Sequence, residues 1–169
     1  MPGALRVVQR VRPMDEVIRK AQIRDVEGIH ALVNRFAGAG SMLARSLSEL
    51  YDDVRDFTVA VAHRGPDPAV VGCCALRVFW KDLAEIRSLA VSEDAQGHGV
   101  GRALVVACLD EARALGVPRV FALTYEPDFF AKFGFGRVDR EALPHKVWMD
   151  CLRCPKYPNC DEVAVAVDL

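Results

Sequence analysis

A glycine-rich turn is the segment of this sequence best suited to chemistry. Residues 96–102 read Gln-Gly-His-Gly-Val-Gly-Arg, and an apolar run with helical periodicity follows over 100–115. Three glycines within five residues let the backbone turn sharply and let a ligand approach it closely. The first N–H groups of a helix have no internal partner, and the helix dipole adds partial positive charge there. The turn therefore predicts an anion-binding site suited to a pyrophosphate.

Two common phosphate loops do not fit this turn. A P-loop requires Lys followed by Ser or Thr at the helix start, whereas Gly101-Arg102-Ala103 stands here. A Rossmann fingerprint has glycines spaced G-x-G-x-x-G after the first strand of a parallel unit. The glycines of this chain are spaced G-x-G-x-G and lie in the middle of the chain. A plain helix cap with glycines for packing is the remaining alternative to a ligand site.

The turn resembles the acyl-CoA-binding motif of the GNAT acetyltransferase superfamily, Gln/Arg-x-x-Gly-x-Gly/Ala. Residues 96–101 match it at every fixed position, and Leu-Ala-Val at 89–91 and Phe-Phe-Ala-Lys-Phe-Gly-Phe at 129–135 match the superfamily's layout. The resemblance covers residues 17–139. It implies acetyl-CoA as the co-substrate, with no metal required for catalysis.

The same resemblance assigns the residues that contact the donor. Backbone N–H groups of residues 97–102 are expected to hold the pyrophosphate, and the pantetheine is expected to run beside strand 89–91. A backbone N–H near Leu89 or Val91 is expected to bind the thioester oxygen as charge develops there. The expected CoA-binding residues are Leu89, Ala90, Val91, Gln96, Gly97, His98, Gly99, Val100, Gly101 and Arg102.

Glu85 is the candidate general base. An ammonium cannot attack a thioester, so acetyl transfer to an amine requires a group that accepts a proton, directly or through water. Glu85 lies six residues before Val91 on the strand that leads to the turn. The alternative interpretation is a surface strand residue paired with Arg87.

A narrower resemblance concerns the acceptor. Residues 84–91, 121–130 and Leu143-Pro144 are similar to the acetyltransferase domain of bacterial N-acetylglutamate synthases, closest to short forms without an amino-acid-kinase domain. This similarity implies transfer to the α-amine of L-glutamate, the first step of arginine biosynthesis. Phe130 stands where many GNAT enzymes have a tyrosine acid, as it does in the synthases. Tyr125 is then either a substitute acid or an aromatic packing residue.

Glutamate carries two carboxylates, and arginine is the side chain that binds carboxylates best. Residues 43–46 (Leu-Ala-Arg-Ser) resemble the synthase loop whose arginine binds substrate, so Arg45 is the first choice. Arg87 lies two residues from Glu85 and shares its strand face, where it binds substrate or orients Glu85. The family supplies a second carboxylate contact in the tail, for which Lys156 is selected over Lys146 and Arg153.

The cysteines of the tail are spaced Cys151-x-x-Cys154-x5-Cys160. Cys-x-x-Cys is a common half-site for zinc, which His145 or Asp161 would complete. Only one pair has the preferred spacing, so free structural cysteines are favoured and no metal ligand is assigned.

The elements that position these residues alternate between strands and helices. Strands are expected at 16–21, 57–62, 70–80, 84–92, 119–124 and 162–167, and helices at 25–36, from Ser46 with a Ser46–Glu49 capping box, at 100–115 and at 127–133. Residues 139–159 read as a polar, Pro-rich segment. This order predicts an α/β (α+β) fold in which a mixed, mostly antiparallel sheet contains a central β-α-β acyl-CoA unit and has helices on both faces.

Residues 1–15 are expected to be an irregular N-terminal extension, with Met14 as an alternative start. One acetyltransferase domain is expected over 16–169, with a Cys/Pro-rich tail at 140–161.

Composition limits the partners. The 169 residues are 51% hydrophobic and carry a net charge of −1, which excludes a disordered chain and, lacking a basic excess, argues against nucleic acid. No apolar run is long enough to span a bilayer, so no membrane partner is expected. A poor signal-peptide pattern and sparse cysteines favour the cytoplasm. The expected partner is a small molecule, L-glutamate, and homodimers are common in the superfamily.

Two rival functions remain. One is a GNAT enzyme for another amine, such as a different amino acid, a polyamine or a protein amine. The other is a non-catalytic module that senses acyl-CoA or a metal, because one fold hosts many functions.

Overall fold

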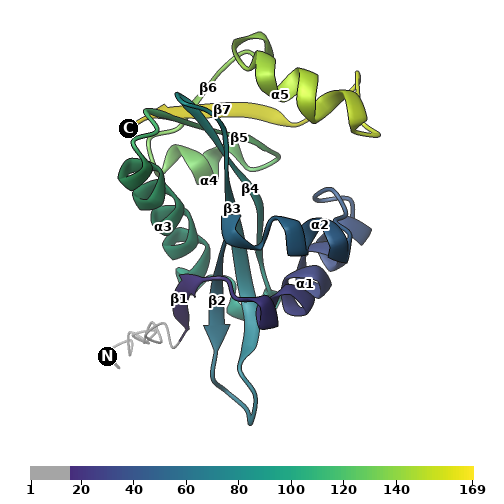
Figure 1. The fold of residues 1–169 in the computed structure, drawn as a ribbon, viewed down its shortest axis with the longest axis vertical. Helices are drawn as coiled ribbons and strands as arrows, with labels where there is room; N and C mark the ends of the chain where they lie inside the picture. The colour runs from purple at the N-terminus through teal and green to yellow at the C-terminus, as the bar shows by residue number, and fades with distance from the viewer. Residues whose placement is uncertain (1–15) are drawn as a thin grey trace, which may run out of the picture.

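The computed structural model describes residues 16–169, except the side chains of His145 and Val147. The expected extension over residues 1–15 and the alternative start at Met14 lie outside the described residues. The described residues form one seven-stranded sheet in the order β1-β2-β3-β4-β5-β7-β6 (Figure 1). Its strands are β1 (Val17–Lys20), β2 (Phe57–Ala62), β3 (Ala69–Trp80), β4 (Leu83–Val91), β5 (Arg119–Thr124), β6 (Gly136–Arg137) and β7 (Val163–Asp168).

Neighbouring strands are antiparallel except for β4 and β5, which are parallel. Helix α3 (Val100–Leu115) joins these two strands and makes the central β-α-β unit. The predicted mixed, mostly antiparallel sheet is therefore confirmed.

Helices cover both faces of the sheet. Helices α1 (Val26–Gly38) and α2 (Leu47–Asp52) lie on one face and α3 on the other, as Figure 1 shows. Helix α4 (Pro127–Ala131) follows β5, and α5 (Pro144–Met149) lies in the tail. Short 3-10 turns are formed by Ile23–Asp25, Val54–Asp56, Glu93–Ala95, Arg140–Ala142 and Cys151–Arg153. No helix within residues 16–169 is long and apolar enough to cross a membrane.

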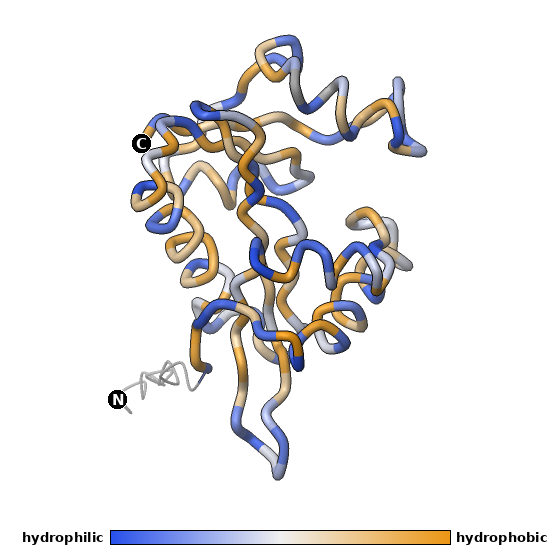
Figure 2. The backbone as a smooth tube through the Cα atoms, viewed as in Figure 1, coloured by the Kyte–Doolittle hydropathy of each residue, from blue (hydrophilic) through white to orange (hydrophobic). Residues whose placement is uncertain are grey.

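Two apolar cores hold the layers together. Val100, Leu104 and Cys108 of α3 pack on one face of the sheet, and Val26, Ile29 and Val33 of α1 pack on the other. The helical spacing of these residues places them along one stripe of each helix, which is the stripe that burial requires. Figure 2 shows the same pattern, with hydrophobic colour along the central strands and hydrophilic colour at the β2–β3 connection.

Strand β4 carries an irregularity that shapes the site. Cys73 pairs with Ala90 and Ala75 pairs with Arg87, so β4 contains one residue more than β3 between these pairs. Ser88 has a φ of +53°, as an inserted residue of a β-bulge can have. The bulge reverses the alternation, because Ile86 packs toward α3 before it and Ala90 packs toward α1 after it. Glu85 and Arg87 both precede the bulge and therefore share a face.

Strands β4 and β5 pair over a short length. The parallel register joins Ala84 to Val120 and Glu85 to Phe121 only. Beyond these residues no pairing joins the two strands within the described chain, so the second half of β4 has an edge that is free of β5. Backbone N–H groups along that edge are left available to a ligand.

The expected elements agree with the observed ones within a few residues, and the tail differs most. The segment 139–159, expected to be polar and Pro-rich and assigned no helix, contains α5. Pro144 occupies its first turn, where a proline has the right φ and no N–H is missed. Leu143 before it is buried with Phe121 and Ala164 under the sheet, which anchors the helix.

Candidate active site

A cleft of about 1800 Å³ runs along the free edge of β4 and collects most of the predicted site residues. It is bordered by the α1–α2 connection, the turn before α3 and the tail. The predicted residues that line it are Arg45, Glu85, Arg87, Leu89, Ala90, Val91, Gln96, Gly97, Gly99, Val100, Gly101 and Arg102. His98 and Lys156 do not line it.

The glycine turn has the backbone that an anion site requires. Gly97 and Gly99 have φ of +75° and +87°, and an added Cβ would meet nothing within 4 Å at either. Conformation, and not space, is therefore what demands glycine at these positions. The N–H of Ala103 bonds to the carbonyl of Gly99 at 3.0 Å, so the preceding N–H groups of α3 have no intrahelical acceptor.

Side chains fix the turn to its surroundings. The Gln96 amide donates to the Val91 carbonyl over 2.9 Å and ties the turn to the end of β4. The Arg102 guanidinium lies 5.7 Å from the ring centre of Phe133. Phe130 is buried in the core beside α3, consistent with a packing residue at that position.

Glu85 is buried and ion-paired, with only 4% of its side chain exposed. Its carboxylate accepts from the Lys146 ammonium at 2.9 Å, and the same ammonium reaches Asp150 at 3.1 Å. The interpretation as a surface residue paired with Arg87 is therefore wrong, because α5 covers Glu85 and supplies a different cation.

The pKa directions in this group follow from burial and charge. Burial raises the pKa of Glu85, and the nearby Lys146 and Arg87 cations oppose that rise only partly. Burial would lower the pKa of Lys146, but the carboxylates of Glu85 and Asp150 outweigh it and raise that pKa. A buried carboxylate with a raised pKa is a stronger base than an exposed one, which makes Glu85 a candidate general base.

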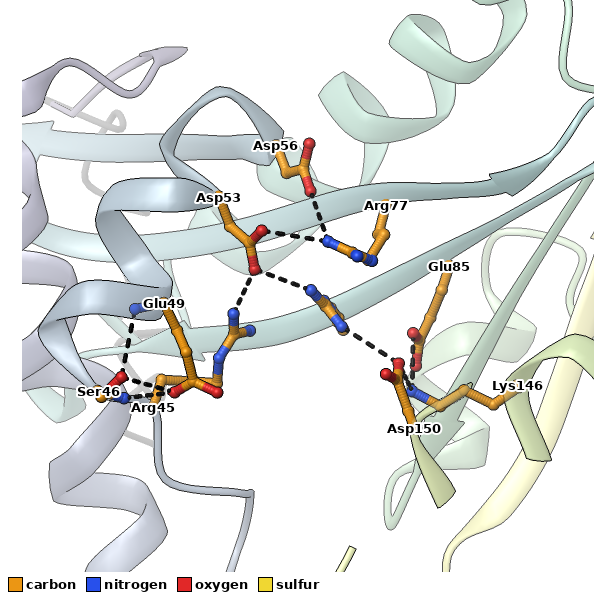
Figure 3. Close-up of polar contacts among 10 residues, drawn as sticks. Arg45, Ser46, Glu49, Asp53, Asp56, Arg77, Glu85, Lys146 and Asp150 are labelled. Carbon is orange, nitrogen blue, oxygen red and sulfur yellow. Dashed lines mark hydrogen bonds and ion pairs between the residues drawn. The ribbon is translucent and has the colours of Figure 1, made fainter. Parts of the chain in front are cut away.

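A chain of alternating charges extends from Glu85 across the cleft (Figure 3). Arg87 donates to Asp150 at 3.4 Å and to Asp53 at 3.1 Å. Asp53 also accepts from Arg45. The cleft thus brings together two arginines expected to bind substrate and the expected base.

Arg45 is held by local structure. The Asn34 side chain on α1 accepts from the Arg45 N–H at 3.0 Å and donates to its carbonyl at 2.8 Å. The next residue, Ser46, begins α2 with the predicted capping box, since its hydroxyl accepts from the Glu49 N–H while the Glu49 carboxylate accepts from the Ser46 N–H. The connection between the two helices is therefore fixed where Arg45 enters the cleft.

The tail places Lys156 and Tyr125 differently from expectation. The Lys156 ammonium bonds to the Tyr125 hydroxyl, which donates to Asp161 at 2.7 Å. Lys156 itself does not line the cleft, whereas its partner Tyr125 does, so the expected carboxylate contact through Lys156 stays a prediction. Tyr125 is an exposed residue with polar contacts rather than a packing aromatic.

The six cysteines are free thiols. Cys151, Cys154 and Cys160 line the cleft, and Arg140 donates to the sulfur of Cys160 at 3.1 Å. Burial raises the pKa of Cys151. Among the side chains that the structure describes, which do not include that of His145, no group of three or more His, Cys, Asp or Glu is arranged to hold a metal ion.

Three residues of the site were not selected from the sequence. The sequence favours Lys156 over Lys146, and no pattern in it marks Asp150 or Asp53 as a site residue. Lys146 and Asp150 are spaced i, i+4 behind Pro144, a pattern that could have revealed a short helix with both side chains on one face. Nothing in the local sequence marks Asp53, because its partners come from separate segments.

Comparison with known proteins identifies the class. A profile of the Acetyltransferase (GNAT) family matches residues 30–135, more than half of the chain. The chain therefore belongs to the GNAT family, which confirms the expected class of enzyme, an N-acetyltransferase.

Individual relatives refine this placement. An uncharacterized N-acetyltransferase of Chlorobaculum tepidum is 39% identical over 92% of this chain and 97% of its own. The amino-acid acetyltransferase of Mycobacterium tuberculosis is 40% identical over 87% of this chain and 83% of its own. The structure of N-acetylglutamate synthase from Neisseria gonorrhoeae with coenzyme A and N-acetyl-glutamate has a TM-score of 0.78 and 29% identity. It matches 91% of this chain, which spans 35% of that protein.

Proposed function

We propose that this protein transfers the acetyl group of acetyl-CoA to the α-amine of L-glutamate. The observation that carries the proposal is one cleft with two different ends. One end has the glycine turn and the free N–H groups of α3. The other has a buried carboxylate beside arginines, which suits a substrate that carries both an amine and carboxylates.

The donor end fits acetyl-CoA. In this proposal the N–H groups of residues 97–102 bind the pyrophosphate, and the side of β4 that lacks β5 receives the pantetheine. An N–H near Leu89 or Val91 donates to the thioester oxygen. The support is the positive φ of Gly97 and Gly99, the short β4–β5 pairing and the coenzyme A bound in a related structure.

The acceptor end fits a dicarboxylic amino acid. Arg45 and Arg87 converge on Asp53, so their guanidinium groups lie side by side at the cleft. They are proposed to bind the carboxylates of L-glutamate with the N–H groups that their contacts with Asp53 leave free. The relatives named amino-acid acetyltransferase and N-acetylglutamate synthase support this substrate class.

Glu85 is proposed to accept the proton of the ammonium. The amine lone pair then attacks the thioester carbon, a C–N bond forms and the C–S bond breaks. As the C–S bond breaks, the nitrogen loses its second proton to solvent and becomes the amide nitrogen. Coenzyme A leaves as a thiolate, which is a good leaving group, and the proton held by Glu85 passes to solvent or to that thiolate. Lys146 keeps the Glu85 carboxylate in place through their 2.9 Å contact.

We further propose a place in arginine biosynthesis in the cytoplasm. The free state of all six cysteines suits a reducing compartment.

Release of coenzyme A, followed with a thiol reagent, tests the proposal. The acceptors are L-glutamate, L-glutamine, L-aspartate, L-lysine, spermidine and a blank without acceptor. Turnover that depends on glutamate, with aspartate and spermidine poor, supports the proposal. Turnover with another amine alone refutes L-glutamate as the substrate. No turnover with any acceptor, despite binding of acetyl-CoA, refutes the proposed acetyltransferase activity.

Arg45→Gln refines the same assay. Loss of one charged hydrogen-bonding partner costs about 1.5–3 kcal/mol, so the KM for glutamate is expected to rise by about tenfold or more. Arg113→Gln is the matched control, because Arg113 lies on the exposed side of α3 and pairs with Asp110. An equal effect of both changes would remove Arg45 from the acceptor site.

A further inference from the structure

Asp53 lies at the centre of three arginines. Its two carboxylate oxygens accept from Arg45, from Arg87 at 3.1 Å and from Arg77 at 3.1 Å. Figure 3 shows Arg45 and Arg77 directed toward Asp53. These arginines, here called the arginine cluster, come from the α1–α2 connection, β3 and β4. One carboxylate is therefore the junction of three chain segments.

Like charge opposes the assembly of this cluster, and an anion between the arginines offsets that repulsion. Three guanidinium groups within reach of one carboxylate repel one another, and their side chains are only 12%, 34% and 17% exposed for Arg45, Arg77 and Arg87. Water screens such partly buried charges less well than fully exposed ones. The Asp53 carboxylate supplies the opposite charge and, as an acceptor with two oxygens, also sets the directions of the guanidinium planes.

Asp53 is itself held in place. It follows the last residue of α2, and its N–H bonds to the Glu49 carbonyl at 2.9 Å. Its carbonyl accepts from the Asp56 N–H at 2.9 Å. The Asp53 carboxylate is thus attached to a backbone segment that two hydrogen bonds hold in place.

Arg45 and Arg87 retain N–H donors that no protein acceptor uses among the described residues. Arg45 uses one nitrogen on Asp53, and the Nε of Arg87 is buried with no partner within residues 16–169. A guanidinium has five N–H donors, so each of the two arginines has donors beyond those directed at the protein. An unpaired buried donor is costly unless a ligand satisfies it.

We propose that Asp53 is a positioning residue that sets the affinity of this enzyme for carboxylate-bearing acceptors. It acts through Arg45 and Arg87, which it holds side by side with donors left for the substrate. The inference rests on the proposed function, because it takes these arginines as the acceptor site.

The alternative is that Asp53 competes with the substrate carboxylate for the arginines. If Asp53 occupied the place of a substrate carboxylate, its removal would free the arginines and lower the KM for the acceptor. If Asp53 positions them, its removal lets the guanidinium groups move apart and raises the KM. The two roles therefore predict opposite signs.

The experiment compares Asp53→Asn with Asp56→Asn in the full chain. Both changes remove one negative charge within three residues of each other. Asp56 reaches Arg77 at 3.8 Å and, among the described residues, forms no ion pair with Arg45 or Arg87. Steady-state release of coenzyme A gives KM and kcat with L-glutamate, and thermal unfolding checks that each variant is folded.

We expect Asp53→Asn to raise the KM for glutamate by about tenfold or more, which corresponds to about 1.4 kcal/mol. The KM for acetyl-CoA and the values for Asp56→Asn should stay near those of the unmodified protein, and kcat should fall by less than KM rises. A lower KM for glutamate, or equal effects of the two variants, overturns the inference.

Two further results keep the inference separate from the proposed function. If Asp53→Asn does not fold, Asp53→Glu keeps the charge but moves it by one methylene. It should raise the KM for glutamate at least about threefold above the Asp56→Asn control, and no rise overturns the inference. If the unmodified protein acetylates a different carboxylate-bearing amine, the substrate proposal fails while the same comparison tests Asp53 with that amine. If it acetylates only amines without a carboxylate, both fail.

Discussion

Replacement of Glu85 by glutamine tests the proposed base most directly. Glutamine has nearly the same shape but cannot accept the proton of an ammonium. Glu85 has a 4% exposed side chain, so bulk water has poor access to take over its role. A positioned general base contributes about 10²- to 10⁴-fold to rate, and we expect kcat to fall by that factor.

The donor site should not respond to this change. Glu85 precedes the bulge at Ser88, whereas the glycine turn proposed to bind the pyrophosphate begins only after β4 has ended at Val91. The KM for acetyl-CoA should therefore remain within about twofold, and Lys146 keeps Asp150 as a partner at 3.1 Å.

The assay is steady-state release of coenzyme A with saturating glutamate, with acetyl-CoA binding measured separately by calorimetry. Arg113→Gln serves again as a surface control, and thermal unfolding shows whether each variant is folded. A folded Glu85→Gln protein with kcat within about threefold of the unmodified protein would refute the reasoning, because a threefold loss of rate is far smaller than the contribution of a general base. A loss of acetyl-CoA binding equal to the loss of kcat would show that Glu85 supports the donor site instead.

Three other predictions concern pH and the glycine turn. Because burial holds the pKa of Glu85 above its ordinary value, kcat/KM should fall as pH falls through that raised pKa. Glu85→Gln should lack this acidic limb of the pH–rate profile. An identical acidic limb in both proteins would assign the titration to another group. Lys146→Met removes the cation that favours the Glu85 carboxylate, so the acidic limb should move to higher pH, and a shift to lower pH would contradict the pairing. Gly99→Ala should destabilise the protein by about 1–2 kcal/mol in denaturant unfolding and raise the KM for acetyl-CoA, because Gly99 has a φ of +87°; Gly38→Ala, at a position without positive φ, is the control and should show neither effect.

Several features of the site could be predicted from the sequence because they depend on neighbouring residues. Three glycines and a helical run specify a turn with positive φ at Gly97 and Gly99. Ser46 and Glu49 specify a capping box, which the structure contains. Strand alternation places Glu85 and Arg87 on one face, and both line the cleft.

The tail could not be predicted in the same way. Its short helix α5 has six residues, too few to be stable or to show a clear period alone, so it forms because Leu143 is buried under the sheet. Its placement decides which lysine faces Glu85. Without that placement, Lys146 and Lys156 are equivalent cations in a polar segment.

The class of enzyme, the positive φ of the glycine turn and the shared strand face of Glu85 and Arg87 could thus be predicted from sequence alone, because each depends on residues close together in the chain. Only the tertiary structure decided how the charges pair. Lys146 meets Glu85 across 61 positions of sequence, and Asp53 meets Arg87 across 34. These contacts depend on sheet register, on the bulge at Ser88 and on the packing of α5. The physical reason is that a salt bridge depends on distance in space, which local sequence patterns do not encode.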